Sequence, residues 1–309
     1  MIYLTIKGRL GNQMFQYAMA RALQEKLNTE ILIDWHHVIE SDKRDPGVGY
    51  KNSLCDFNVS DFKSIDQSKY RENMSLCQYL AFRSYEKNFP FGGNIESKAA
   101  FERNFYNKHK HSGLLFFENG YIDFDLSRLP KNIFLSGYYE STKYFENIKD
   151  KIKQEFTPIY PKLEHNFELY DKIENTNSVC VTVRRGDFVK SSFHNVCRTE
   201  YFLKGMDIIA EKVDNPHFFI FSDDVDWLKQ NVNFKYPVTF ETGNDPVWEK
   251  LRMMYSCKHF VISNSTFSWW AQFLSKNENK VVVSPDRWYN DKLESDLIEN
   301  SDFIKIMCD

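Results

Sequence analysis

Two adjacent arginines after a short apolar run are the residues of this sequence best suited to chemistry. Residues 179–183 predict a buried strand, and Arg184-Arg185-Gly186-Asp187 follow it. A planar guanidinium matches two phosphate oxygens at once, and ligands of α/β proteins bind at the carboxyl ends of strands. The pattern therefore indicates a phosphate site. The alternative is a structural ion pair in which Asp187 holds one of the arginines.

Two further predicted strands in the second half of the chain also end in polar clusters. Residues 217–221 run into Ser222-Asp223-Asp224, whose oxygens suit ribose hydroxyls or the amino group of a purine. Residues 259–262 run into Ser263-Asn264-Ser265-Thr266-Phe267 at the start of a helix, where backbone N–H groups bind phosphate. Each cluster alone could be helix capping. Three clusters on one sheet edge predict a nucleotide-diphosphate pocket. The sequence lacks the G-x-x-x-x-G-K-[ST] motif, which argues against a P-loop phosphotransferase.

Regular alternation of strands and helices positions these clusters. Helical patterns cover residues 199–212, the segment through Trp227, the segment from Pro246 to Tyr255 and the segment around Trp269-Trp270. Further strands are predicted near residues 237–240 and 281–283. Strands that alternate with helices predict parallel βαβ units with right-handed crossovers, so the fold class is α/β.

The first 34 residues predict another β-α-β unit. Residues 2–6 and 30–34 read as strands, with a helix from Gln13 to Lys26 between them. The turn holds Gly8 and Gly11 without the third glycine of G-x-G-x-x-G, which argues against a dinucleotide cofactor. We expect a glycine turn that lets a ligand approach, with Asn12 and Gln13 at the helix N-terminus. The alternative is a turn with an Asn cap.

Residues 35–130 are polar and irregular, with helical patterns around residues 66–83, and we interpret them as an insertion packed over the first sheet. His36 and His37 follow the second strand, where a surface or pocket-wall position is favoured over metal binding. Residues 132–136 predict a returning strand, followed by Gly137-Tyr138-Tyr139-Glu140 and a helix over residues 142–156. Tyrosines and a carboxylate at a strand end suit sugar stacking and hydroxyl recognition or base catalysis. The alternative is a capping segment with core tyrosines.

Length and composition favour two domains, which we place at residues 1–160 and 161–309. The formal charge of −3 provides no field that would recruit nucleic acid. Six scattered cysteines without a C-x-x-C pair favour a reducing compartment over a disulfide framework or zinc site. No signal peptide or membrane-spanning apolar run is visible. We expect a cytoplasmic protein, with peripheral association to the inner face of the membrane left open.

Four motifs in the same order resemble the bacterial α-1,2-fucosyltransferases of glycosyltransferase family 11. They are residues 8–17 (GRLGNQMFQY), 183–187 (VRRGD), 221–224 (FSDD) and 262–270 (ISNSTFSWW). The resemblance implies a GT-B-type architecture of two Rossmann-like domains facing across a cleft, with the acceptor on the N-terminal side. It also implies inverting transfer of L-fucose from GDP-β-L-fucose to the 2-hydroxyl of a terminal galactoside on a glycan, without a metal.

The resemblance also implies roles for single residues. Arg185 is expected to contact the β-phosphate and stabilise departing GDP, with Arg184 in support. The remaining donor-binding residues are Ser222, Asp223 and Asp224 toward the guanosine and Ser265, Thr266 and Phe267 along the diphosphate. Gly11, Asn12, Gln13, Thr182 and Tyr138 are expected to border donor and acceptor. For the catalytic base, Glu140, Asp187 and Asp34 all remain candidates.

One position departs from the family pattern. The motif is usually written H-x-R-R-x-D, and Thr182 stands in place of its histidine. A threonine hydroxyl can form hydrogen bonds but cannot act as a general base near neutral pH. Alternatives to α-1,2-fucosyl transfer are another linkage, another GDP-sugar, or a non-catalytic module that binds nucleotides or glycans.

Overall fold

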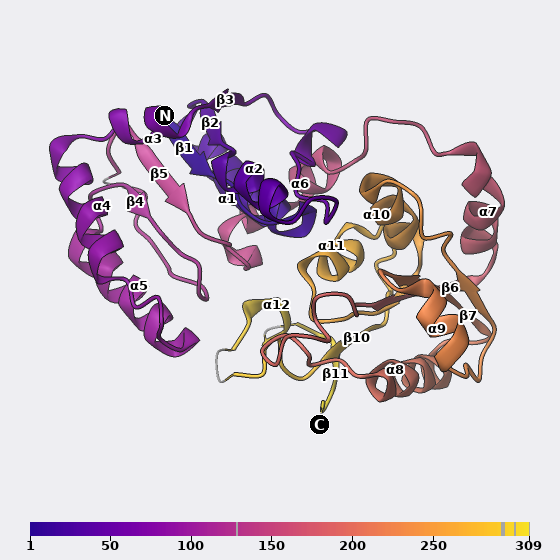
Figure 1. The fold of residues 1–309 in the computed structure, drawn as a ribbon. Coiled ribbons are helices and arrows are strands. Elements are labelled where there is room, and N and C mark those ends of the chain that lie inside the picture. The colour runs from indigo at the N-terminus through magenta and orange to yellow at the C-terminus, as the bar shows by residue number, and fades with distance from the viewer. Residues whose placement is uncertain (128, 292–293, 300, 309) are drawn as a thin grey trace. The chain divides into compact units, whose positions relative to one another are not determined.

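The computed structural model describes residues 1–127, 129–291, 294–299 and 301–308. The chain forms two compact units (Figure 1). The N-terminal unit contains Met1–Cys55 and Val59–Glu155, and the C-terminal unit contains Asp56–Asn58 and Phe156–Asp309. Each unit is built around its own parallel sheet.

The sheet of the N-terminal unit has the strand order β3-β2-β1-β5-β4, and every neighbouring pair is parallel. Thr5 lies opposite both Asp34 and Ser136, so the carboxyl ends of β1, β2 and β5 are level. The strand order changes direction between β1 and β5. The strands are β1 Ile2–Thr5, β2 Ile31–Asp34, β3 Lys63–Ile65, β4 Leu114–Leu115 and β5 Ile133–Ser136.

The helices of this unit correct three sequence predictions. Helix α1 begins at Leu10, so Gly11 and Gln13 lie in its first turn and are buried, whereas a turn was expected through Gly11. The helix expected over residues 142–156 is two 3-10 turns followed by a shorter helix. The region read as an irregular insertion contributes both edge strands and four helices. The helices are α1 Leu10–Leu27, α2 His36–Arg44, α3 Gln67–Glu72, α4 Leu76–Asn88, α5 Ile95–His109 and α6 Lys149–Glu155.

The sheet of the C-terminal unit has the order β11-β10-β9-β6-β7-β8, again with all pairs parallel. Counted from β6 as the first strand, this is the Rossmann order 3-2-1-4-5-6. Its direction changes between β6 and β9, and ligands of such sheets bind at that switch point. The strands are β6 Asn177–Val183, β7 Pro216–Ser222, β8 Val238–Phe240, β9 His259–Val261, β10 Val282–Pro285 and β11 Ile304–Ile306.

Apolar side chains of β6 and β7 pack with helix α8 in the core of this unit. Val179, Val181, Phe218 and Ile220 form one buried cluster with the inner face of α8. The sequence prediction of this helix is confirmed to the residue. The helices are α7 Phe167–Asn175, α8 Thr199–Lys212, α9 Val225–Asn231, α10 Val247–Ser256, α11 Thr266–Leu274 and α12 Asp296–Glu299.

Candidate functional site

The arginine pair lies directly after β6, at the switch point of the C-terminal sheet. Arg184 forms ion pairs with Asp187 (Nη2 to Oδ1, 2.5 Å) and Asp223 (Nη1 to Oδ2, 2.6 Å). Its guanidinium also lies 5.4 Å from the ring centroid of Phe188. Because Asp223 follows β7 and Asp187 follows β6, these contacts fix Arg184 between two neighbouring strand ends.

Arg185 is held less firmly. Its Nε donates to Asp224 Oδ2 over 3.3 Å, and its guanidinium carbon lies 3.2 Å from the ring centroid of Trp227 on α9. Both partners are partly exposed, with the Asp224 side chain 42% accessible. A stacked guanidinium keeps its orientation while its outer N–H groups stay available to a ligand.

The carboxylates after β7 act on the arginines and on the backbone. Asp223 Oδ1 accepts the backbone N–H of Arg185 over 2.8 Å, and Asp224 Oδ1 caps α9 by accepting the N–H of Trp227. A Cβ on Gly186 would approach Asp223 Oδ2 to 2.6 Å, so a larger residue at this position would have to displace the Asp223 carboxylate. Ser222 is buried, and its Oγ accepts the N–H of Asp224. The predicted contacts of these residues with guanosine stay predictions.

The cluster after β9 forms the other side of the switch point. Ser265, Thr266 and Phe267 are partly exposed at the start of α11, whereas Ser263 and Ser268 are buried and joined through their hydroxyls. The first N–H groups of a helix have no carbonyl partner within the helix and carry partial positive charge, which suits an anion. This cluster and the arginines follow neighbouring parallel strands and so lie at one edge of the sheet, as the sequence predicted. The sequence analysis did not predict that the two strands are neighbours.

Thr182 supports this cluster from within the sheet. It is 4% exposed, and its Oγ1 accepts the N–H of Ser263 over 3.1 Å. The residue at the usual histidine position therefore links β6 to the turn that follows β9. Its expected contact with donor or acceptor stays a prediction.

In the N-terminal unit, the predicted glycine loop is built by backbone geometry and buried amides. Gly8 has φ of +79°, which favours glycine, and a Cβ there would meet Asn12 Nδ2 at 2.6 Å. Gln13 is fully buried and donates to the carbonyls of Gly8 and Lys51. Asn12 is the partly exposed residue of the expected group Gly11, Asn12 and Gln13.

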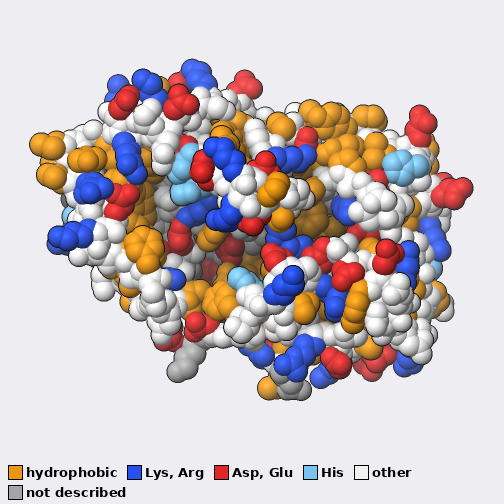
Figure 2. Space-filling view, in the orientation of Figure 1, with side chains coloured by type: hydrophobic (Ala, Val, Ile, Leu, Met, Phe, Trp, Pro, Cys, Tyr) orange, Lys and Arg blue, Asp and Glu red, His pale blue; other side chains and the backbone are white. Residues whose placement is uncertain are grey.

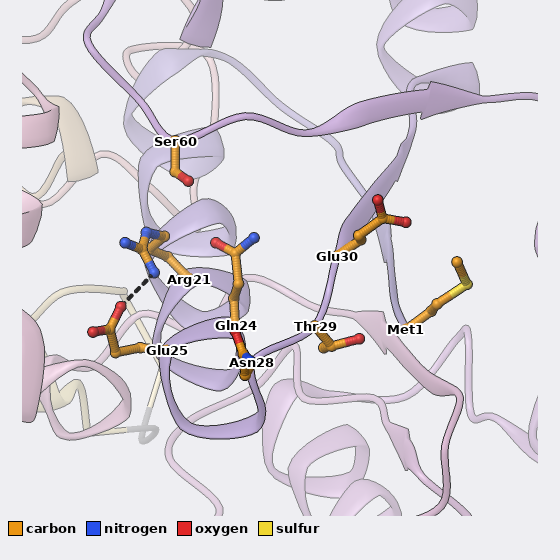
Figure 3. Close-up of a pocket in the computed structure, with 8 residues that line it drawn as sticks. All are labelled: Met1, Arg21, Gln24, Glu25, Asn28, Thr29, Glu30 and Ser60. Carbon is orange, nitrogen blue, oxygen red and sulfur yellow. Dashed lines mark hydrogen bonds and ion pairs between the residues drawn. The ribbon is translucent and has the colours of Figure 1, made fainter.

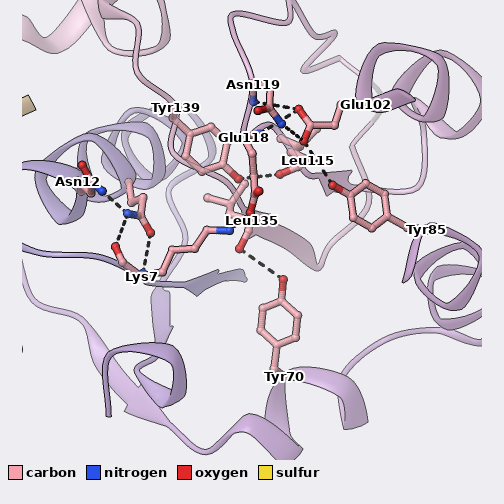
Figure 4. A network of polar contacts seen from close by, with 11 residues as sticks. Lys7, Asn12, Tyr70, Tyr85, Glu102, Leu115, Glu118, Asn119, Leu135 and Tyr139 are labelled. Carbon is pink, nitrogen blue, oxygen red and sulfur yellow. Dashed lines mark hydrogen bonds and ion pairs between the residues drawn. The ribbon is translucent and has the colours of Figure 1, made fainter. Parts of the chain in front are cut away.

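Lys7 is a residue that the sequence analysis missed. It follows β1 and forms an ion pair with Glu118 (Figure 4). Its Nζ also lies 5.1 Å from the ring centroid of Tyr138. Burial lowers the pKa of Lys7 to about 8. Tyr138 follows β5, so this contact spans the switch point of the N-terminal sheet. The only sequence signal was the position of Lys7 immediately before the glycine loop.

A buried carboxylate orders the segment that carries Glu118. Glu102 on α5 is fully buried and accepts the N–H groups of Glu118 and Asn119 over 3.1 and 3.0 Å (Figure 4). Burial raises the pKa of Glu102 to about 7, although its hydrogen bonds oppose the shift. Nothing in the helical pattern of residues 95–109 distinguishes Glu102 as buried, so its role depends on tertiary structure.

Of the three base candidates, Asp34 has the most directed geometry. Its side chain is 2% exposed at the end of β2, and its Oδ2 lies 2.6 Å from His36 Nδ1. Asp187 is paired with Arg184. Glu140 is partly buried beside Tyr139, whose φ of +51° places it in a strained backbone region. The structure thus brings Asp34 together with a histidine expected only to line a surface or pocket.

A hollow at the amino ends of the N-terminal sheet's strands lies away from the candidate residues, which follow the carboxyl ends. It is lined by Met1, Asn28 and Glu30, at the amino ends of β1 and β2 and the end of α1, and Arg21 borders it (Figure 3). Arg21 is engaged by Glu155 and Glu25, each over 2.9 Å. Ligands of parallel sheets bind at the carboxyl ends, so we assign no substrate to this hollow.

The residues that the structure describes include no group of three or more His, Cys, Asp or Glu side chains placed to hold a metal ion. Asp224-Val225-Asp226 has the Asp-x-Asp spacing typical of metal-dependent glycosyltransferases. Here Asp224 instead contacts Arg185 and caps α9. The strand ends therefore present guanidinium groups and helix N–H groups as the candidate partners of an anion.

Residues 101–306 match the family model described as Glycosyl transferase family 11. The chain belongs to this family. The family expected from the sequence is confirmed, and the two Rossmann-like units are the GT-B-type fold that it implied. As a family 11 member, the protein is a glycosyltransferase.

Sequence relatives agree with this assignment, and a solved structure has a similar fold. An alpha-1,2-colitosyltransferase of Escherichia coli is 29% identical over 92% of this chain and 91% of its own. The O-antigen biosynthesis glycosyltransferase WbnK of E. coli is 28% identical over 97% and 99%. The structure of NodZ alpha-1,6-fucosyltransferase soaked with GDP-fucose has a TM-score of 0.52, at 11% identity, over 92% of this chain and 94% of that one. At that identity, the likeness concerns the fold.

Proposed function

We propose that this family 11 glycosyltransferase transfers L-fucose from GDP-β-L-fucose to the 2-hydroxyl of a terminal galactoside, with inversion. The observation that carries the proposal is the arginine pair at the Rossmann switch point, beside the N-terminus of α11. This combination suits a nucleoside diphosphate that must leave as a dianion or trianion. The names of several relatives, including a galactoside 2-alpha-L-fucosyltransferase of Caenorhabditis elegans, support the linkage.

In the proposed mechanism, Arg185 releases the Nε contact with Asp224 and directs its guanidinium N–H groups to the β-phosphate while it stays stacked on Trp227. Arg184 stays fixed by Asp187 and Asp223 and adds positive charge. As the glycosidic bond lengthens, charge builds on the leaving phosphate, and preorganised cations stabilise that state more than the ground state. The two guanidiniums supply the charge that a metal supplies in other transferases. We therefore propose transfer without a metal, which activity in excess EDTA would test.

The acceptor sugar is assigned to the switch point of the N-terminal sheet. Tyr138 offers an aromatic ring with the Lys7 ammonium beside it, and Asn12 offers a partly exposed amide in the first turn of α1. We assign the base to His36, with Asp34 holding its Nδ1–H so that Nε2 accepts the proton of the attacking hydroxyl. Gln67 Nε2 lies 3.0 Å from His36 Nε2. An amide N–H donor at this distance is consistent with an unprotonated His36 Nε2 that accepts hydrogen bonds.

A second candidate donor is GDP-colitose, because a relative that matches nearly the whole chain is named an alpha-1,2-colitosyltransferase. Colitose is fucose without the 3-hydroxyl. A site that hydrogen-bonds that hydroxyl would reject the deoxy sugar strongly, whereas an apolar pocket would discriminate weakly. The ratio of kcat/KM for the two GDP-sugars distinguishes the candidates.

The experiment that tests the function is an acceptor screen. GDP release from GDP-fucose is measured with and without terminal galactosides, and the linkage of each product is determined. Acceptor-dependent release with a fucosyl-α-1,2-galactose product supports the proposal. Release with another linkage, turnover of another GDP-sugar only, or GDP binding without turnover would reject it.

A further inference from the structure

Helix α4 exposes apolar side chains on the side that faces away from its own unit. Leu76, Tyr79 and Leu80 are 73%, 41% and 59% exposed. Gln78 and Ala81, on the opposite side, are buried. At 3.6 residues per turn, Leu76, Leu80, Arg83 and Lys87 form one row along the helix. We call Leu76, Tyr79, Leu80 and the following Arg83 and Lys87 the α4 face.

The surroundings of the α4 face are basic, although the chain as a whole is acidic. Residues 67–111, which contain α3, α4 and α5, hold eight Lys and Arg against four Asp and Glu, a net charge of +4. The whole chain carries −3, so its remaining residues carry −7. Figure 2 shows orange apolar side chains and blue basic side chains mixed over the part of the molecule where Figure 1 places α4 and α5.

Two of the four acids in this segment contribute little negative charge to its surface. Glu102 is buried against the segment after β4. Glu86 is shared by Arg71 and Arg83, over 3.5 and 3.0 Å. Lys69 is paired with Glu72 over 3.2 Å, whereas the exposed lysines Lys87, Lys108 and Lys110 lie on α4, on α5 and just after α5. Apolar side chains on a helix surrounded by long cationic ones are the pattern of helices that lie in a membrane interface.

We propose that the α4 face and the lysines around it bind the surface of an anionic phospholipid bilayer. Leu76 and Leu80 enter the region between headgroups and acyl chains, Tyr79 lies at headgroup level, and the lysines bind the phosphates. Binding of this kind is peripheral, and no helix of the described residues is long and apolar enough to span a bilayer. The basic charge around the α4 face favours an anionic surface over a symmetric dimer, because a two-fold dimer through this face would place two basic segments against each other.

The test is co-flotation of the full chain with phosphatidylcholine vesicles, with or without about one third phosphatidylglycerol. We expect binding to the anionic vesicles only, weakening as salt rises from 0.1 to 0.5 M because charged contacts are screened. Leu76→Ser with Leu80→Ser should reduce the partition coefficient about tenfold. Lys87→Gln with Lys108→Gln should reduce it about tenfold as well.

Matched controls lie in the C-terminal unit. Ile159→Ser removes an apolar side chain that is 55% exposed, and Lys212→Gln with Lys276→Gln removes two exposed lysines. Both should bind vesicles like the parent. Thermal melts should be similar for all variants, because the substituted side chains are exposed. Equal binding by the leucine variant, equal binding to neutral vesicles, or a parent dimer in sedimentation that the leucine variant loses would overturn the proposal.

Discussion

Replacing Arg185 by Ala should separate catalysis from stability. In the fold, the side chain of Arg185 makes one hydrogen bond of 3.3 Å to a partly exposed carboxylate and one ring contact with Trp227. An exposed ion pair contributes about 0–1 kcal/mol and an exposed cation–π contact about 0.5–1 kcal/mol. The free energy of unfolding should therefore fall by about 1 kcal/mol. Loss of one preorganised partner of the leaving group should lower kcat about 10²–10³-fold.

The assay is steady-state GDP release with GDP-fucose and a galactoside acceptor, beside a thermal melt of each variant. Arg185→Lys should keep part of the rate, because it keeps the charge but loses the planar fork. Arg44→Ala is the matched control, since Arg44 is exposed and paired only locally with Asp45 over 2.8 Å. Turnover of Arg185→Ala within about threefold of the parent would refute the role given to the arginine, since the expected loss is at least 10². If Arg185→Ala loses both its activity and its cooperative melting transition, the claim that Arg185 acts in catalysis and not in stability is refuted.

Three further changes test other parts of the site. His36→Ala should lower kcat about 10²-fold with little change in GDP affinity by calorimetry, and an unchanged kcat would exclude it as the base. Asp224→Asn should strengthen GDP binding if Asp224 competes for Arg185, and weaken it if Asp224 contacts guanosine. Glu102→Gln should remove a pH dependence of stability. The folded state raises the pKa of Glu102 to about 7, so its contribution is most favourable below the unfolded pKa and is lost as pH rises through 7. Urea unfolding of the parent should lose up to about 3 kcal/mol relative to Glu102→Gln between pH 4 and 8, and parallel curves would contradict this.

The polar strand ends of the C-terminal unit were predictable because they depend on local order. A β-branched run followed by Arg184-Arg185 reveals both the strand and its carboxyl end, and parallel βαβ units align such ends on one edge. Strands β3 and β4 were missed because three and two residues are too short to show a period. The pairing of Lys7 with Glu118 joins residues far apart in the chain and depends on where the segment after β4 packs, which residue types alone do not encode. Asp34 and His36 are only two residues apart, but their contact requires α2 to begin directly after β2, and the sequence analysis did not predict that helix.

The sequence left open whether the arginines bind phosphate or form a structural ion pair, and we propose that these alternatives are two successive states of the site. Two guanidiniums face three carboxylates, so the cluster without donor has a net charge near −1 and would repel a diphosphate. Asp187 and Asp223 hold Arg184 over 2.5 and 2.6 Å, whereas Asp224 holds Arg185 over 3.3 Å. The weakest pair is thus the one that the diphosphate must replace. Trp227 keeps Arg185 oriented during the exchange, which explains why the arginine assigned to the β-phosphate is the one stacked on a ring.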